Sequence, residues 1–282
     1  MVYIMLNNGQ PIKAHEKLDR LFPHIEEVGA DYVNDEENAA KITRSNRRLL
    51  KTHLPYEVIP MPPMNNTTVT NTNTNTNNGN GNGNGNGAKY IFIARNPKDC
   101  VVSFFHHTRG FGQHYDFEEG DFDVYFDLFC RGKVDFGNYF HTLKSWMDRR
   151  HDPHVLFVKY EDTSTREDKA SVVKEIAKFI DPKLDLNSKI SDDSSNDSGN
   201  GNDKDTTTLL DKILHFSSLE EMKKEPLRWC SERKSNQTPF IRKGVVGGWK
   251  ELLTEAQGEI LDEIMKKKFP REELELLGNK YS

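Results

Sequence analysis

The sequence predicts an α/β fold with a central parallel sheet flanked by helices. Two short apolar runs, residues 90–93 and residues 155–158, have the length and composition of buried strands. The first run leads into Arg95 and the second into Glu161, so both end on polar residues. Helix-like segments follow both runs, and strands that alternate with helices imply a parallel sheet covered by helices.

The segments before residue 90 predict two helices and a short strand. Residues 1–6 have the pattern of a helix that stops at residues 7–9, Asn-Asn-Gly, and residues 12–21 that of a second short helix. Residues 49–50 lead as a short strand into residues 51–55, Lys-Thr-His-Leu-Pro. This strand would deliver a lysine and a histidine to its polar end.

Helices with one apolar face are expected over much of the remaining chain. The spacing of apolar residues predicts them at residues 100–109, 122–131, 138–149, 169–180, 208–216 and 255–268. In the third of these helices, Phe140, Leu143 and Met147 share a face. Such faces are expected to pack on the sheet or on one another.

Two polar segments of low complexity interrupt the globular pattern. Residues 65–87 are an Asn/Thr tract that turns into alternating Gly-Asn, and residues 188–208 are rich in Ser, Asp, Asn and Gly. Neither segment buries enough apolar surface to offset the entropy of ordering it. We therefore expect a single domain over residues 1–282 with two disordered insertions.

Composition narrows the classes of partner. A formal net charge of -5 argues against broad binding to nucleic acid. The three cysteines are widely spaced, which suggests neither a disulfide framework nor a zinc site and fits a reducing compartment. The sequence shows neither a secretory signal nor a membrane-spanning apolar run, so we expect a cytoplasmic protein without membrane association.

The turn after residues 90–93 has the chemistry of a phosphate site. It offers the guanidinium of Arg95, the ammonium of Lys98 and the hydroxyl of Ser103, and open α/β sheets bind ligands outside the carboxyl ends of their strands. The alternative is that the two cations only solvate a surface loop.

Five segments, taken in order, resemble the cytosolic sulfotransferase family. Three carry the strongest resemblance: residues 51–55, residues 90–103, and residues 240–250 with the run Phe-Ile-Arg-Lys-Gly followed by Gly, Trp and Lys. Residues 160–162, Tyr-Glu-Asp, and residues 217–222, Ser-Ser-Leu-Glu-Glu-Met, fall where the family has equivalent segments. The resemblance covers the chain apart from the two polar insertions.

The resemblance implies transfer of a sulfuryl group from 3′-phosphoadenosine 5′-phosphosulfate (PAPS) to a hydroxyl or amine of a small acceptor, such as a phenol or steroid. PAPS would be the co-substrate, and no metal is implied. In the family, residues that match Arg95, Ser103, Arg242, Lys243 and Gly244 hold the 3′-phosphate of the nucleotide. Two guanidinia, an ammonium and a backbone amide suit a dianion, and a glycine lets the backbone approach it closely.

The adenine would lie among residues that match Tyr160, Ser217, Ser218 and Leu219. Leu219 departs from the aromatic residue of the family, so stacking on the base should be weaker by about 1 kcal/mol.

His53 is the expected general base. A hydroxyl attacks sulfur only as it loses its proton, and an imidazole that titrates near neutrality suits that task. Lys51, two residues earlier on an extended segment, would neutralise charge on the transferring oxygens. The alternative is that His53 is an ordinary surface histidine, one of ten in the chain.

The family's phosphosulfate loop, of the type Tyr-Pro-Lys-Ser-Gly-Thr-Thr-Trp, has no counterpart in this sequence. Residues 1–6 match best the helix that follows the loop, so we expect the chain to start inside the fold. One lost oxyanion donor reduces a rate by about 10²- to 10³-fold, so transfer should be slow. A remnant that binds adenosine bisphosphate or a partner is therefore the rival hypothesis, while a P-loop kinase would need a phosphate loop that is absent.

A dimer contact is expected to be weak. Lys250, Thr254 and Glu259 match part of the family's short dimer motif, but Glu255 stands where that motif has valine. A carboxylate in place of an apolar contact should weaken a homodimer.

Overall fold

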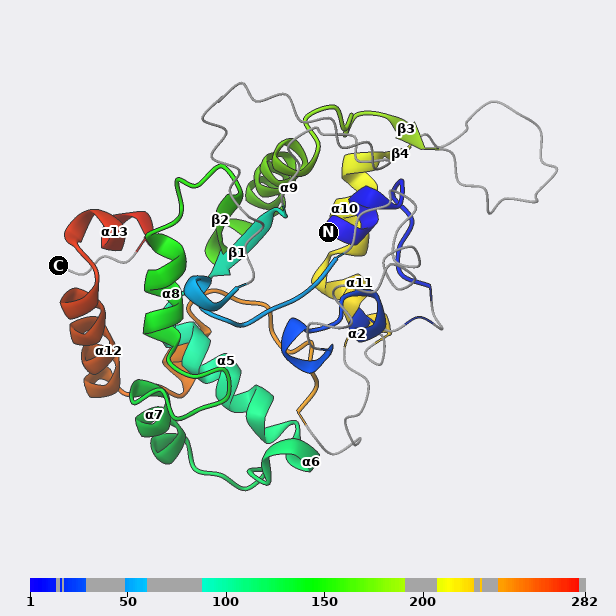
Figure 1. Ribbon diagram of the computed structural model, residues 1–282. Helices are drawn as coiled ribbons and strands as arrows, with labels where there is room; N and C mark the ends of the chain where they lie inside the picture. The colour runs from blue at the N-terminus through cyan, green and yellow to red at the C-terminus, as the bar shows by residue number, and fades with distance from the viewer. Residues whose placement is uncertain are drawn as a thin grey trace, which may run out of the picture.

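Two parallel strands, β1 (Tyr90–Ala94) and β2 (Val155–Lys159), form the centre of the computed structural model (Figure 1). They pair from Tyr90 with Val155 through Ala94 with Lys159. The structure describes residues 1–13, 16, 18–28, 49–59, 88–190, 207–225, 229 and 238–278.

A group of helices packs against one face of the strand pair. Phe92 and Phe157 contact a core that includes the fully buried Phe129, Phe140 and Leu261. This side is built from α5 (Pro97–Arg109), α7 (Phe122–Cys130), α8 (Tyr139–Met147), α12 (Glu255–Lys268) and α13 (Arg271–Leu276).

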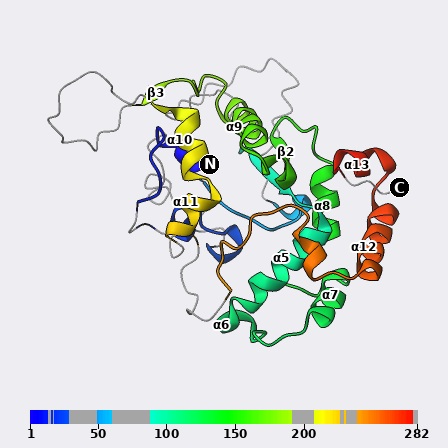
Figure 2. The ribbon, with the colours of Figure 1, turned by 180° about the vertical axis from the view of Figure 1, so that it is seen from behind.

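A second group of helices covers the opposite face, as the two opposite views show (Figures 1 and 2). It consists of α1 (Val2–Leu6), α9 (Arg166–Ile180) and α10 (Leu209–Phe216). Ile91 and Leu156 pack against its core, next in the chain to the phenylalanines that face the other way. Successive side chains of a strand point to opposite faces, so both faces are apolar and the strands read as continuous apolar runs. The predicted fold class is confirmed.

A third, smaller cluster attaches residues 49–59 to α8. The indole N–H of Trp146 donates to the carbonyl of Leu54 at 3.1 Å, and the backbone N–H of Tyr56 donates to Ser145 Oγ at 3.0 Å. Tyr56 and Trp146 are both buried. These contacts fix the position of the segment that carries His53.

Polar caps explain where the longer helices begin. Asn96 caps α5 by accepting from Lys98 N, and Pro97 takes the first helical position. Thr165, Thr208 and Thr254 cap α9, α10 and α12 in the same way. The short elements are α2 (Leu18–Leu21), η1 (Tyr56–Val58), α6 (Gly112–Tyr115), η2 (Tyr160–Thr163), β3 (Lys189–Ile190), β4 (Thr207–Thr208), α11 (Leu219–Lys224) and η4 (Gly248–Glu251).

Two predicted elements are shorter than expected. The strand at residues 49–50 is replaced by a single parallel bridge between His24 and Lys51. The helix expected over residues 12–21 is described only as α2. Both segments are too short to pair or pack along their length, so local composition overstated them.

The first predicted insertion, residues 65–87, lies outside the described residues, as do residues 191–206 of the second. The described ends of the second insertion form the antiparallel pair β3–β4. The borders of both insertions and the single domain over residues 1–282 stay predictions. Among the described residues, no helix combines the length and apolarity needed to cross a bilayer.

Candidate active site

A cavity of about 740 Å³ lies where β1 and β2 end, the edge at which α/β sheets bind ligands. Segments far apart in the sequence meet there: the turn after β1, the residue after β2, the start of α11 and residues 240–248. All eight residues predicted to hold the nucleotide line this cavity: Arg95, Ser103, Tyr160, Ser217, Leu219, Arg242, Lys243 and Gly244.

Arg95 is positioned by contacts with two tyrosines. Its guanidinium lies 4.5 Å from the centroid of the Tyr160 ring, and its carbonyl accepts a hydrogen bond from Tyr139 Oη. Its Nε is buried without a hydrogen-bond partner among the described residues. A buried N–H without a partner is rare in folded proteins, and an anion in the cavity would supply the missing acceptor.

Asp99 fastens residues 240–250 to the start of α5. Its buried carboxylate accepts hydrogen bonds from the backbone N–H of Gly247 at 2.7 Å and of Trp249 at 3.0 Å. These bonds bring the segment that carries Arg242 to the cavity. The sequence analysis missed Asp99, although a carboxylate in the first turn of a helix was a visible signal.

Gly244 lies against Leu219. Its φ is +65°, a conformation that favours glycine, and a Cβ there would lie 3.0 Å from Leu219 Cδ1. Because Gly244 has no side chain, its backbone comes close to Leu219, on the side of the cavity where the adenine is expected.

Lys243 and Arg242, the two cations of residues 240–250 that are predicted to hold the phosphate, differ in their contacts. Lys243 pairs with Glu251 at the surface, so its ammonium is engaged although the residue lines the cavity. Arg242 forms no ion pair among the described residues. Burial, and then the charges of Arg242, Arg109 and Lys243, lower the pKa of nearby His106, while Glu251 opposes the shift. The role of Lys243 stays a prediction.

Two serines at the cavity, Ser217 and Ser218, make local hydrogen bonds. Ser217 Oγ donates to the carbonyl of Ile213 at 2.6 Å, and Ser218 Oγ caps α11 by accepting from Glu221 N at 3.2 Å. Ser103 projects from α5 and lines two cavities. Unlike the other two hydroxyls, that of Ser103 makes no local hydrogen bond within the described residues.

A second cavity of about 530 Å³ adjoins the first, and His53 lines it. The two cavities share Ile93, Arg95, Ser103 and Phe240. Six aromatic side chains line this second cavity: Phe92, Phe104, Phe129, Phe136, Tyr139 and Phe240. Arg242 and Lys243 line only the first cavity, so the first is the more cationic of the two and the second is the richer in aromatic rings.

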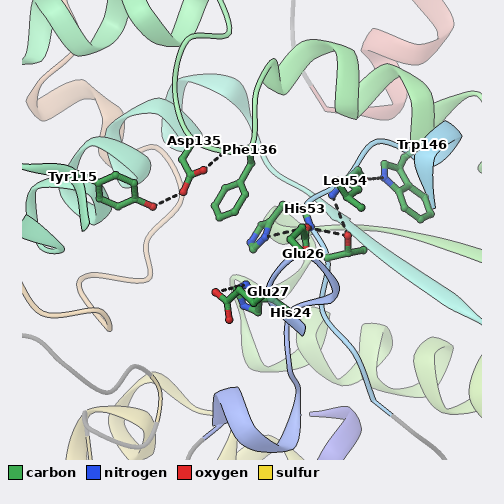
Figure 3. A network of polar contacts seen from close by, with 10 residues as sticks. His24, Glu26, Glu27, His53, Leu54, Tyr115, Asp135, Phe136 and Trp146 are labelled. Atoms are coloured by element: carbon green, nitrogen blue, oxygen red, sulfur yellow. Dashed lines mark hydrogen bonds and ion pairs between the residues drawn. The ribbon is translucent and has the colours of Figure 1, made fainter. Parts of the chain in front are cut away.

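His53 is held by contacts from two segments (Figure 3). Its backbone N–H donates to Glu26 Oε1 at 2.5 Å, and its ring stacks on Phe136 with centroids 3.7 Å apart. Burial, and then the charge of His24, lowers the pKa of His53 to about 4. The imidazole is therefore neutral at neutral pH and can accept a proton. Neither Glu26 nor Phe136 was anticipated, because both contacts are long-range.

Lys51 is not among the residues that line either cavity. It is held by the bridge to the first segment, in which Lys51 N donates to the carbonyl of Pro23 at 3.0 Å and its carbonyl accepts from Ile25 N at 2.9 Å. Its charge contributes to the low pKa of His53, so the two residues are neighbours. A direct role for Lys51 in transfer stays a prediction.

Glu161 links the two strand ends behind the site. Its Oε1 accepts from the backbone N–H of Asn96 at 2.7 Å, so the segment that follows β2 supports the turn after β1. The sequence placed both segments at the same edge but gave no sign of this contact.

Comparison with known proteins agrees with this arrangement. Residues 84–273 match the model of the sulfotransferase domain. Sulfotransferase 1C2 of rabbit is 31% identical over 226 residues, 78% of this chain and 61% of that protein, and human sulfotransferase 1E1 is 28% identical over 93% of this chain and 75% of that protein. The chain thus spans about three fifths of the length of the first of these relatives.

Solved structures share the fold. Retinol dehydratase in complex with androsterone and the inactive cofactor PAP superposes with a TM-score of 0.55 at 22% identity, over 86% of this chain and 59% of that one. A complex of retinol dehydratase with retinol and PAP gives a TM-score of 0.54 at 21% identity, over 90% and 65% of the two chains. Since the matched domain model covers well over half of the sequence, this chain belongs to the sulfotransferase family.

Proposed function

We propose that this protein transfers a sulfuryl group from PAPS to the hydroxyl, or amine, of a small apolar acceptor such as a phenol or steroid. The observation that carries the proposal is the pair of adjoining cavities that meet at Arg95 and Ser103: the first also holds the cations Arg242 and Lys243, and six aromatic side chains line the second. A transferase of this kind must hold two substrates whose reacting groups meet at a shared boundary.

The first cavity suits the nucleotide. The buried Nε of Arg95 lacks an acceptor, and Arg242, Ser103 and the backbone of Gly244 line the same space. These groups would hold the 3′-phosphate, while Tyr160, Ser217 and Leu219 would surround the adenine. PAPS supplies the activated sulfuryl group when it is bound.

The second cavity suits the acceptor. His53 would take the proton of the acceptor hydroxyl as its oxygen forms a bond to sulfur. The bond between sulfur and the bridging oxygen of the 5′-phosphate breaks, and adenosine 3′,5′-bisphosphate (PAP) leaves with the electron pair. The proposal assigns no metal to this step.

The solved relatives support an apolar acceptor. Their complexes hold androsterone in one case and retinol in the other, each beside PAP. Six aromatic side chains line the second cavity here, which fits molecules of that character. We further propose a cytoplasmic location, no nucleic-acid or membrane partner, and at most a weak homodimer.

An alternative is a protein that binds adenosine bisphosphate without transferring sulfate. The low pKa of His53 favours it, because a group with a pKa of about 4 is a weak base. Leu219, in place of an aromatic residue, would also weaken the hold on the base.

Two measurements test the proposal. Incubation with labelled PAPS and a panel of phenols and steroids should give sulfated products. Calorimetry should detect the binding of PAP to the protein. His53→Ala should lower turnover by about 10²- to 10⁴-fold and leave PAP affinity unchanged. His151→Ala, a change at an exposed histidine in the turn before β2, is the matched control. Binding of PAP without any product would support the alternative, and no binding of PAP would overturn both.

A further inference from the structure

His24 and Glu26, which have no part in the proposed transfer, form a cluster with His53. One ligand atom from each residue can be chosen so that all three lie within 4.8 Å of one another. The residues come from two segments, and Figure 3 shows the three side chains gathered at the end of the extended stretch that carries His53. His24 and His53 meet edge to face, with ring centroids 5.0 Å apart.

The backbone holds these residues in place before any ligand binds. The parallel bridge between His24 and Lys51 fixes the two segments side by side. Glu26 Oε1 then accepts from Thr52 Oγ1 at 3.0 Å as well as from His53 N at 2.5 Å. The carboxylate has a second oxygen, Oε2, to offer a cation, while the bonds to Oε1 keep it oriented.

Two imidazoles and one carboxylate are the donor set of a borderline divalent metal such as Zn²⁺. A tetrahedral zinc ion with ligand bonds of about 2.0–2.1 Å places its ligand atoms about 3.3 Å apart. His53 Nδ1 lies 3.8 Å from the other oxygen of the Glu26 carboxylate, Oε1, so the carboxylate group is already beside the ring. Small side-chain rotations would therefore close the cluster, and a fourth position would be left for water.

The local charge also favours a cation. Glu27 Oε1 lies 3.6 Å from His24 Nδ1 and adds a second carboxylate beside Glu26, against the single positive charge of Lys51. The side chains of His24, Glu26 and His53 are 20%, 22% and 39% exposed, so an ion can reach them from solvent.

We propose that His24, Glu26 and His53 form a binding site for a divalent transition metal of the Zn²⁺ class. The metal bond would use a ring nitrogen of His53. Since the proposed function gives His53 the task of accepting a proton, the occupied site would hold the protein in an inactive form. Only this regulatory consequence rests on the proposed function; the site itself does not.

The test uses Co²⁺ and Zn²⁺ as probes of the untagged full chain near neutral pH. Co²⁺ should produce the visible absorption of a four- or five-coordinate ion at one equivalent, and Zn²⁺ should displace it. His24→Phe and His53→Phe, which keep a ring but remove a ligand, should each weaken binding by about tenfold or more. His151→Phe, at an exposed histidine outside the cluster, should bind like the parent chain.

Circular dichroism of each variant establishes that it is folded, and Glu26→Gln provides a second probe that keeps the shape of the side chain. The proposal is overturned if Co²⁺ gives no such band with the parent chain, or if folded His24→Phe binds both ions as the parent does. Neither result depends on PAPS or on turnover, so the site and the proposed function can fail separately.

Discussion

The guanidinium of Arg95 lies over the ring of Tyr160, 4.5 Å from its centroid. Arg95 follows β1 and Tyr160 follows β2, so the contact joins the ends of the two paired strands. An aromatic face attracts a guanidinium and fixes its direction without using its N–H groups. Arg95 therefore keeps hydrogen-bond donors for a ligand, and one of them, Nε, is buried without a partner among the described residues.

Replacing this guanidinium should weaken nucleotide binding. Arg95→Met keeps an unbranched apolar chain but removes the charged donors, and bonds from charged groups contribute about 1.5–3 kcal/mol each. We expect PAP affinity measured by calorimetry to fall by about 10- to 100-fold. Arg131→Met is the matched control, because Arg131 is an exposed residue paired with Asp127 on the surface of α7. Equal affinity of Arg95→Met and the parent would remove Arg95 from the site.

Asp99 should matter for both stability and binding. In Asp99→Ala the backbone N–H groups of Gly247 and Trp249 lose their buried acceptor, which costs about 1–3 kcal/mol of unfolding free energy. Urea unfolding should show this loss, and PAP affinity should fall because the segment with Arg242 is no longer fixed. Asp185→Ala, which removes an exposed bond to Asn187 N, should change neither. An unchanged urea midpoint for Asp99→Ala would contradict this account.

The strands and longer helices were predictable because their signals are local. β1 and β2 pack apolar side chains against a core on each face, which makes each a continuous apolar run. The start of α5 was placed three residues late, since Lys98 and Asp99 break the apolar pattern while Asn96 and Pro97 form a cap. Short elements such as α11 and α13 carry too few residues for a clear period.

The local chemistry of the turn after β1 predicted that Arg95 and Ser103 line a ligand site, together with Lys98, which instead pairs with Asp262; the rest of the site was predictable only through family resemblance. Nothing in periodicity or spacing brings Arg242 to Arg95, because that meeting depends on the bonds that Asp99 makes to residues more than a hundred positions away. For the same reason the sequence did not show that Lys243 pairs with Glu251, or that Phe136 covers His53. Tertiary contacts of this kind leave no local trace.

An aromatic residue at position 219 should strengthen nucleotide binding. Leu219 is about one third exposed, lies against Gly244 and lines the first cavity, where the family has an aromatic side chain. Leu219→Phe would add a ring contact of about 0.5–1.5 kcal/mol to the adenine. Calorimetry with PAP should then show about 2- to 12-fold tighter binding. Val246→Phe adds a ring at an exposed residue outside the cavity lining and should have no effect, and a loss of affinity in Leu219→Phe would place the adenine elsewhere.

The thiol of Cys100 should resist alkylation in the folded protein. Burial raises the pKa of Cys100 to about 12, although the charge of Arg95 opposes the shift. The thiolate is the reactive form, so raising the pH from 7 to 9 should leave Cys100 protonated and slow to react. Burial raises the pKa of Cys130 to about 11, and that residue provides an internal comparison with about ten times more thiolate.

The measurement is mass spectrometry of peptides after timed exposure to iodoacetamide, with and without urea. In urea both cysteines should regain an ordinary pKa of about 8.5 and react at similar rates. In the folded chain Cys100 should react more slowly than Cys130, and both should react far more slowly than in urea. Because Cys100 directly follows Asp99 in the first turn of α5 and is close enough to feel the charge of Arg95, fast alkylation in the folded state would mean that this end of the helix is not packed as described. Fast alkylation would therefore contradict the raised pKa of Cys100, and it would also weaken the case for the nucleotide cavity.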